Sequence, residues 1–194
     1  MEKNIIINIG RQFGSGGRVI ASMIGEKLGI EVYDSELLLK AAERSGVRPE
    51  FFRRNDEKKR FFTLGYSQNA INDEGLFKIQ SETIRGIAAN GSAVFVGRAA
   101  DYVLRDQDNC LDVFVSAPLE WRKNNVSKRS GMSPEEAEKL IQKKDKARES
   151  WYNFFTFGNW GVASNYDLCL DTSILGHEGT ADFIIEFARR EGLL

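Results

Sequence analysis

Five short runs of apolar residues recur along the chain, separated by longer segments in which apolar positions repeat at helical spacing. The runs are Ile5–Ile9, Ile30–Tyr33, Ala93–Val96, Leu111–Val115 and Leu168–Leu170. Nearly continuous aliphatic runs of this length are typical of parallel strands that are buried on both faces. Strands that alternate with helices form a parallel sheet with helices on each side. The pattern therefore predicts an α/β fold of three layers, α/β/α, around a five-stranded parallel sheet.

Helices are indicated by apolar spacing and by their end signals. Between the first two runs, apolar residues at helical spacing end at Leu28, and Gly29 follows as a C-cap. The sequence Ser-Pro-Glu-Glu at Ser133–Glu136 predicts a helix start, because it matches a capping box with proline at the first helical position. Further helices are expected over about Gly75–Ala89 and about Thr180–Arg190.

Two long intervals, residues 35–92 and 120–165, interrupt this alternation and leave room for helical insertions. Insertions at the carboxyl ends of strands are where ligands bind in open α/β sheets. The length of 194 residues suits one domain, and no low-complexity linker divides the chain. We therefore expect a single domain over residues 1–194 that carries both insertions.

The composition says little about the fold, but it limits the classes of function that the chain can have. The 27 Lys and Arg residues are balanced by 28 Asp and Glu residues, for a net charge of −1. That balance gives no electrostatic reason to expect nucleic-acid binding, although a local basic pocket is compatible with it. No apolar run approaches the roughly 20 residues of a membrane span, and a soluble, cytoplasmic protein is expected.

The single histidine and the two cysteines argue against several classes of active site. His177 lies in a glycine-rich stretch that favours a solvated loop, and one histidine cannot form a site built from several. Cys110 and Cys169 lie far apart in apolar stretches, which favours two buried thiols over a disulfide or a zinc site. Phosphate chemistry remains, since it needs neither thiols nor imidazoles.

The first predicted strand leads through Gly14, Ser15, Gly16 and Gly17 into the first predicted helix. Glycines let the backbone turn so that successive N–H groups point toward one anion, and the helix N-terminus adds partial positive charge. Strand, glycine loop and helix in this order predict a phosphate-binding loop. A glycine-rich turn without a ligand is the alternative.

The loop departs from the standard string GxxxxGK[ST]. When Gly16 is matched to its last glycine, Gly17 stands at the lysine position, Arg18 at the hydroxyl position and Arg11 at the first glycine. The lysine normally reaches the transferred phosphate, and the hydroxyl holds magnesium. Arg11 and Arg18 are candidate phosphate ligands in its place, whereas no residue replaces the hydroxyl.

Taken in order, these and later motifs resemble the cytidylate kinase-like family of P-loop nucleoside monophosphate kinases over most of the chain. The motifs are Gly14–Arg18, Tyr33-Asp34, Gly97-Arg98 with Asp101, Arg122, Asp145-x-x-Arg148 and Tyr166–Thr172. The resemblance implies a P-loop NTPase fold. It also implies a helical acceptor-binding insert over about 35–92 and a mobile helical lid over about 120–165.

The resemblance assigns roles beside the acceptor. Asp34 and Lys40 stand where the family borders the acceptor phosphate, although Asp34 could equally cap the next helix and Lys40 could be a solvated charge. Arg98 follows the third strand and is expected in the crevice above the phosphate loop. Asp101 is a candidate magnesium contact through water, with a structural pairing to an arginine as the alternative.

The expected lid is basic, because residues 120–148 hold nine Lys and Arg residues against five Asp and Glu residues. Arginines there can neutralise charge on a transferred phosphoryl group, and a solvated helix surface is the alternative. The candidate catalytic arginines of the core and lid are Arg18, Arg98, Arg122, Arg129 and Arg148. The aromatic run Trp151–Trp160 either packs the lid on the core or stacks on a base.

These features favour an ATP-dependent kinase of a small acceptor, with CMP or dCMP as the first candidate. ATP would be the donor, Mg²⁺ would arrive with the nucleotide, and small nucleotides would be the partners; the oligomeric state stays open. Two alternatives remain. Because the lysine and the hydroxyl are absent, the chain could be a nucleotide-binding sensor or scaffold with little turnover, or it could phosphorylate another small metabolite.

Overall fold

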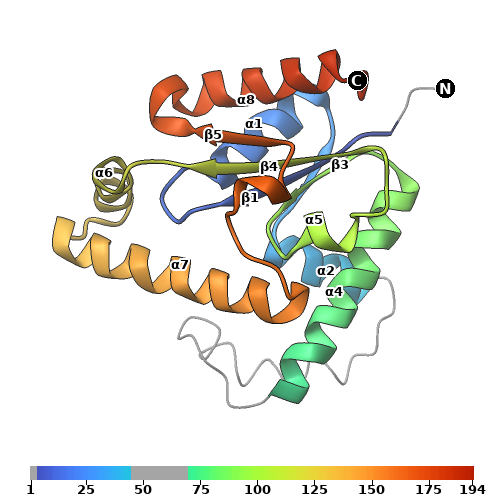
Figure 1. Cartoon of the computed structure of the whole chain (residues 1–194), viewed down its shortest axis with the longest axis horizontal. Helices are drawn as coiled ribbons and strands as arrows, with labels where there is room; N and C mark the ends of the chain where they lie inside the picture. Colours follow the sequence, from blue (N-terminus) through green and yellow to red (C-terminus); the bar gives the residue numbers. More distant parts are fainter. Residues whose placement is uncertain (1–3, 45–69) are drawn as a thin grey trace.

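A computed structural model describes residues 4–44 and 70–194 of the chain. Its centre is a parallel five-stranded sheet in the order β2-β3-β1-β4-β5 (Figure 1). The strands are β1 Ile6–Arg11, β2 Glu31–Tyr33, β3 Ala93–Val96, β4 Cys110–Ser116 and β5 Leu168–Asp171. Each coincides with a predicted apolar run to within two residues at either end, so the predicted parallel sheet is confirmed.

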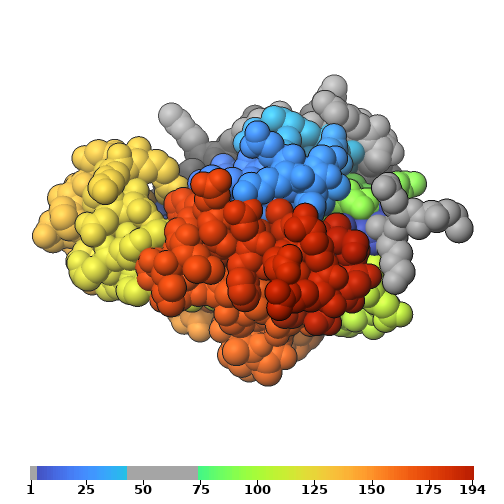
Figure 2. Space-filling view, turned by 90° about the horizontal axis from the view of Figure 1, so that it is seen from above, coloured from blue at the N-terminus to red at the C-terminus, as the bar shows by residue number. Residues whose placement is uncertain are grey.

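Helices cover both faces of the sheet, which confirms the three-layer arrangement. On one face, α1 (Gly17–Leu28) lies beside α8 (Thr172–Arg190), as Figures 1 and 2 show. The other face carries α2 (Ser35–Arg44), α4 (Ala70–Asn90) and the short α5 (Ala100–Val103). The middle of the expected acceptor-binding insert, residues 45–69, lies outside the described residues.

The alternation of side chains along β1 builds the two apolar cores. Ile7 and Ile9 point toward α1 and α8, where they join Ile20 and Ile184 in the larger cluster. Ile6 points to the opposite face and packs with residues of β3, α2, α4 and α5. Strands buried on both faces need apolar residues at successive positions, which explains why the runs read as continuous.

Two further helices, α6 (Leu119–Ser130) and α7 (Pro134–Thr156), form a hairpin over the edge where β1 and β4 end (Figure 1). The predicted capping box is present, since the Ser133 hydroxyl accepts from the Glu136 N–H and the Glu136 carboxylate accepts from the Ser133 N–H. Val126, Ala137 and Ile141 give the hairpin a small core of its own. The hairpin occupies the place of the expected lid.

Helix ends follow their predicted signals except at the starts of α4 and α8; α4 begins at Ala70, five residues before its predicted start. Gly29 caps α1 with a left-handed φ of 68°. The last helix begins at Thr172, eight residues before the predicted start, because the Asp171 carboxylate accepts from the Ser173 N–H and caps it there. Gly176, at φ 66°, then bends the helix. No helix within the described residues is long and apolar enough to span a membrane.

Two predictions about single side chains are wrong. Cys110 is partly buried, but Cys169 is exposed, because its side chain points outward from the edge strand β5. His177 is not in a solvated loop: it lies within α8, just after the bend, and its Nε2 is buried. The bend at Gly176 explains the glycine-rich sequence that suggested a loop.

Candidate phosphate-binding site

The loop between β1 and α1 has a backbone shape that depends on its glycines. Gly14 and Gly16 adopt left-handed φ values of 85° and 88°, which residues with a side chain rarely adopt. Between them Ser15 is buried, and its hydroxyl donates toward the backbone oxygens of Gln12 at 2.9 Å and Val115 at 3.1 Å. Gly16 precedes α1 and offers no capping side chain, so the first N–H groups of α1 are available to an anion.

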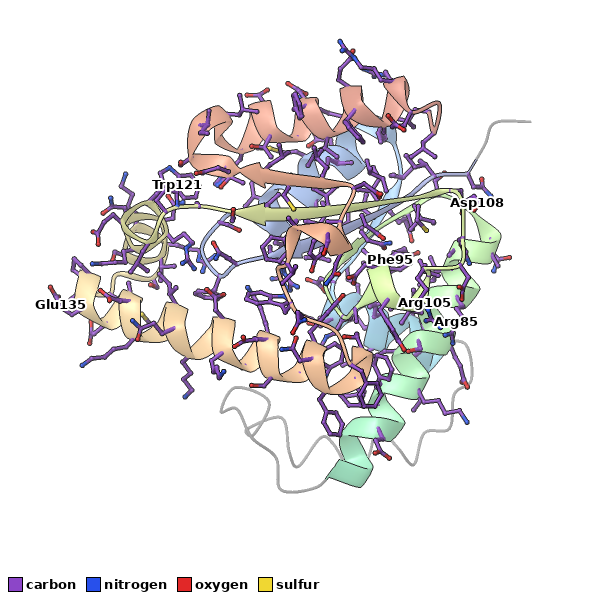
Figure 3. All side chains as sticks on the ribbon, viewed as in Figure 1. Arg85, Phe95, Arg105, Asp108, Trp121 and Glu135 are labelled. Carbon is purple, nitrogen blue, oxygen red and sulfur yellow. The ribbon has the colours of Figure 1, made fainter. Side chains whose placement is uncertain are left out.

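Neighbouring helices hold this loop in place. The Thr172 hydroxyl at the start of α8 donates to the Ser15 backbone oxygen at 2.8 Å, and the Asn125 amide on α6 donates to the Gly14 oxygen at 3.3 Å. His177 lies so close to Gly16 that a Cβ at that position would collide with its imidazole. Its ring also meets the ring of Trp121, labelled on α6 in Figure 3, at a centroid distance of 5.5 Å.

A buried ion pair ties the α6–α7 hairpin to the loop. The Asp145 carboxylate on α7 accepts from the Phe13 N–H and from Nη1 of Arg122, each at 2.6 Å. The same Nη1 atom lies 3.3 Å from the Phe13 backbone oxygen. The Arg122 side chain is 10% exposed and the Asp145 side chain is 18% exposed. The Arg122 charge is therefore engaged in fixing Phe13.

Four arginines from different elements surround the loop. Arg11 ends β1, Arg18 lies in the first turn of α1, Arg98 follows β3, and Arg148 extends from α7. Nη1 of Arg148 donates to the Arg11 backbone oxygen at 3.1 Å. Burial and the charges of the other three guanidinium groups hold the pKa of Arg11 well below its usual value. Such a cluster of like charges favours binding of a polyanion.

Arg98 and Arg148 are also buried, and burial lowers the pKa of each. Burial and the charge of Arg148 lower the pKa of Arg98 to about 10, and burial lowers the pKa of Arg148. The guanidinium of Arg98 lies over the Trp151 ring, 5.5 Å from its centroid. Arg98 adopts a left-handed φ of 61°, which is unusual for a residue with a side chain and is common at functional sites.

Asp34 performs two tasks at the end of β2. Its Oδ1 accepts from the N–H groups of Glu36 at 2.9 Å and Leu37 at 3.1 Å. Asp34 therefore caps α2, which is one of the two roles expected for it. Its Oδ2 forms an ion pair with Arg18, whose side chain is 70% exposed. Asp34 therefore orients an arginine of the loop while it starts the next helix.

Other predicted residues lie farther from this cluster. Lys40 is on the exposed side of α2, where its ammonium contacts Glu36 at 3.0 Å. Arg129 is exposed at the end of α6, with its guanidinium 5.5 Å from the centroid of the Phe13 ring. The Asp101 carboxylate accepts a 2.7 Å hydrogen bond from the Tyr152 hydroxyl, and burial raises its pKa. Within the described ranges, no group of three His, Cys, Asp or Glu side chains could hold a metal.

The aromatic run packs the end of α7 on the core. Phe155 stacks on Phe77 of α4 at 4.4 Å between ring centroids, and Trp151 meets the edge of the same ring at 5.7 Å. Trp160 packs against Phe114 of β4 at 5.5 Å. The packing interpretation is confirmed for these three residues.

Sequence reasoning missed several residues that shape the site. Asp145 belongs to a recognised motif, and its spacing to Arg148 places both on one face of a helix, but nothing in the sequence indicates its contact with Phe13. Asn125, Trp121 and His177 carry no local signal, because their contacts with the loop region or with each other arise only from the tertiary fold.

Comparison with known proteins finds related sequences and similar folds. The sequence model of the cytidylate kinase-like family matches residues 6–174 of this chain. A cytidylate kinase of Methanopyrus kandleri is 29% identical over 179 residues, which cover 88% of this chain and 86% of that protein. An uncharacterized protein from Eubacterium ventriosum has a crystal structure with a TM-score of 0.75, 28% identity and coverage of 97% of this chain and 99% of its own. The crystal structure of a shikimate kinase from Bacteroides thetaiotaomicron has a TM-score of 0.54 at 12% identity, with coverage of 98% and 99%, and shares the fold.

Proposed function

Because the chain belongs to the cytidylate kinase-like family, we propose that it is an ATP-dependent kinase that phosphorylates a nucleoside monophosphate, with CMP or dCMP as the acceptor. The family and the kinase relatives support a phosphotransferase. The observation that carries the proposal is that Arg11 and Arg148 meet beside a glycine loop at a helix N-terminus, with Arg18 in the first turn of that helix. Phosphoryl transfer depends mainly on positioning and on neutralising phosphate charge.

The residues present fit the phosphates of ATP, which supplies the γ-phosphoryl group when bound. The loop from Gly14 to Gly17 would bind these phosphates through backbone N–H groups, with Ser15 holding the loop from beneath. Arg11 and Arg18 would place positive charge beside them. Guanidinium groups suit this task because their forked donors match two oxygens of one phosphate.

The acceptor would lie at the carboxyl ends of β2 and β3. Arg98 would bind its phosphate from the end of β3, and Asp34 would border it while holding Arg18 in place. Lys40 would reach the acceptor by leaving Glu36, an exposed pairing of the kind that contributes little to stability. An acceptor phosphate oxygen would attack the γ-phosphorus in line as the bond to the bridging oxygen of ADP breaks.

The three arginines of the lid would have three different roles. Arg148 lies within the cluster and would neutralise the transferred group. Arg122 would act through Asp145 and Phe13 and thereby fix the loop. Arg129 stands near the rim of the loop, beside the Phe13 ring, and would approach the nucleotide when the hairpin closes.

Magnesium fits the loop less well than the nucleotide does. The standard string provides a hydroxyl for the metal, and Arg18 occupies that position here. The nearby Ser15 hydroxyl donates to backbone oxygens beneath the loop, and Asp101 is hydrogen-bonded to Tyr152. In the proposal Mg²⁺ therefore arrives with ATP and meets Asp101 at most through water.

A second candidate function follows from the same departure. With Gly17 at the lysine position and no loop hydroxyl, the protein could bind a nucleotide as a sensor or scaffold with little turnover. A coupled assay with Mg-ATP and a panel of CMP, dCMP, UMP, AMP and GMP separates the two. We expect turnover to be fastest with CMP or dCMP. ATP binding measured by calorimetry, together with no turnover on any acceptor, would favour the sensor.

A further inference from the structure

The residues at the first and seventh positions of the loop string face each other. A Cβ built on Gly17 would lie 2.7 Å from Cβ of Arg11 and 2.9 Å from its Cγ. Real Cβ atoms do not approach other carbon atoms this closely, and the Arg11 Cβ is fixed by the backbone of β1. Side chains at residues 17 and 11 therefore exclude each other from the Cβ outward.

The backbone itself does not require glycine at residue 17. Gly17 is absent from the residues with positive φ, and it begins a regular helix. Its remaining neighbour, Cγ2 of Val115, would lie 3.2 Å from an added Cβ, a distance that small shifts relieve. The stem of Arg11 is thus the principal reason for glycine at the lysine position.

The guanidinium end of Arg11 also explains why residue 97 is a glycine. A Cβ on Gly97, at the end of β3, would overlap Nη1 of Arg11, and the φ of Gly97 is 71°. Arg11 therefore runs over Gly17 and ends beside Gly97, at the edge of the sheet where the phosphate loop and Arg98 meet. The standard string has its small residue first and its long cation seventh; this chain has them in the reverse order.

We propose that Arg11 takes the place of the phosphate-loop lysine, and that Gly17 and Gly97 are glycines because they leave room for its side chain. The inference rests on the proposed function in assuming a phosphate ligand at this loop. The guanidinium is oriented by its stem, and the nearby charges of Arg18, Arg98 and Arg148 give it a reason to bind an anion. Within the described residues, no carboxylate forms a salt bridge with Arg11.

A reciprocal exchange tests this arrangement. Four variants are compared with the wild type: Arg11→Met, which keeps the stem and removes the charge; Arg11→Lys; Gly17→Lys; and the double variant Arg11→Gly with Gly17→Lys, which restores the standard order. The probe is inorganic tripolyphosphate, with affinity measured by calorimetry and folding by thermal melting. Arg190→Met, which removes an exposed charge paired with Glu186 at the end of α8, is the matched control.

We expect Arg11→Met to weaken tripolyphosphate binding by about 10- to 100-fold, the range for losing hydrogen bonds from a charged group, and Arg11→Lys to retain most of it. Gly17→Lys alone should melt at a lower temperature and bind weakly. The double variant should bind within about tenfold of the wild type, since the new lysine enters the space that Arg11 leaves. A merely structural role for Arg11 predicts unchanged tripolyphosphate binding by Arg11→Met, so that variant separates the two roles, whereas the double variant tests the shared space at residues 11 and 17.

Three results would overturn the inference: no tripolyphosphate binding by the wild type, unchanged binding by Arg11→Met, or a double variant that binds no better than Gly17→Lys. If Arg11→Met fails to melt cooperatively, Arg11→Gln, which keeps a polar side chain without the charge, takes its place in the comparison. A kinase assay on the same proteins keeps the two proposals apart. Loss of turnover on every acceptor would remove the proposed function, whereas the pattern of tripolyphosphate affinities would still test Arg11.

Discussion

The Asp145 carboxylate accepts the backbone N–H of Phe13 at 2.6 Å across 132 residues of sequence. Its other oxygen holds Arg122, so one carboxylate joins the hairpin to the phosphate loop. Breaking a buried ion pair by removing one partner leaves the other charge uncompensated, at a cost of about 3–5 kcal/mol. The contact is therefore both a loop anchor and a large contribution to stability.

Asp145→Ala is expected to lower the free energy of unfolding by about 3 kcal/mol or more, measured by urea denaturation. Glu149→Ala, one turn farther along α7, is the control, because its carboxylate pairs with an exposed lysine, Lys146. That change should lie within about 1 kcal/mol of the wild type. Equal losses for the two variants would contradict the anchoring role of Asp145.

Arg148→Ala is expected to lower kcat by about 100-fold, the usual effect of removing one donor that stabilises transition-state charge. The KM for ATP should change less, since the loop backbone stays in place. Lys146→Ala removes an exposed cation from the same helix and should leave kcat unchanged. The measurement is steady-state kinetics with CMP or dCMP. An unchanged kcat for Arg148→Ala would exclude the arginine from the reaction.

Gly97→Ala and Gly131→Ala form a matched pair. The two glycines have φ values of 71° and 69°, but an added Cβ meets the Arg11 guanidinium at Gly97 and open space at Gly131. Each variant should lose about 1 kcal/mol of stability from backbone strain. Only Gly97→Ala should weaken tripolyphosphate affinity, by about tenfold or more, since it displaces Arg11. Similar affinities in the two variants would argue against a role for the space at Gly97.

The pH dependence of stability should report on Asp112. Burial, helped by the charges of Asp101 and Asp167 and opposed by a hydrogen bond from Asn8, raises the pKa of this carboxyl from 3.8 to about 6. Between these values the folded chain holds a proton that the unfolded chain releases. The free energy of unfolding should therefore fall as pH rises from about 4 to 6, by up to about 3 kcal/mol, and then level off.

Asp112→Asn removes this titration and is the direct test. An amide at residue 112 can still accept from Asn8 Nδ2, and it can also donate to Asn8 Oδ1, which is buried without a hydrogen-bond partner among the described residues. We expect the variant to be more stable than the wild type above pH 6, with the difference vanishing near pH 4. Chemical denaturation across that range measures it, and parallel curves for the two proteins would refute the assignment.

Local signals in the sequence sufficed for the sheet and most helix ends. The strands needed only their apolar runs, and the helix starting at Ser133 needed only its capping box, since both depend on adjacent residues. The contact of Asp145 with Phe13 and that of Arg11 with Gly17 depend on how the chain folds back on itself. The glycine stretch around His177 misled for the same reason: a loop and a bent helix contain similar residues.

Helix α7 extends without a break over 23 residues, roughly 34 Å at 1.5 Å per residue. Its first turns pack in the hairpin core, its middle contacts Phe13 and Arg11, and its last turns pack on Phe77 of α4. One unbroken helix makes all three sets of contacts. A ligand that tilts it at the phosphate loop must also shift its aromatic end, so donor and acceptor affinities should change each other by the same factor.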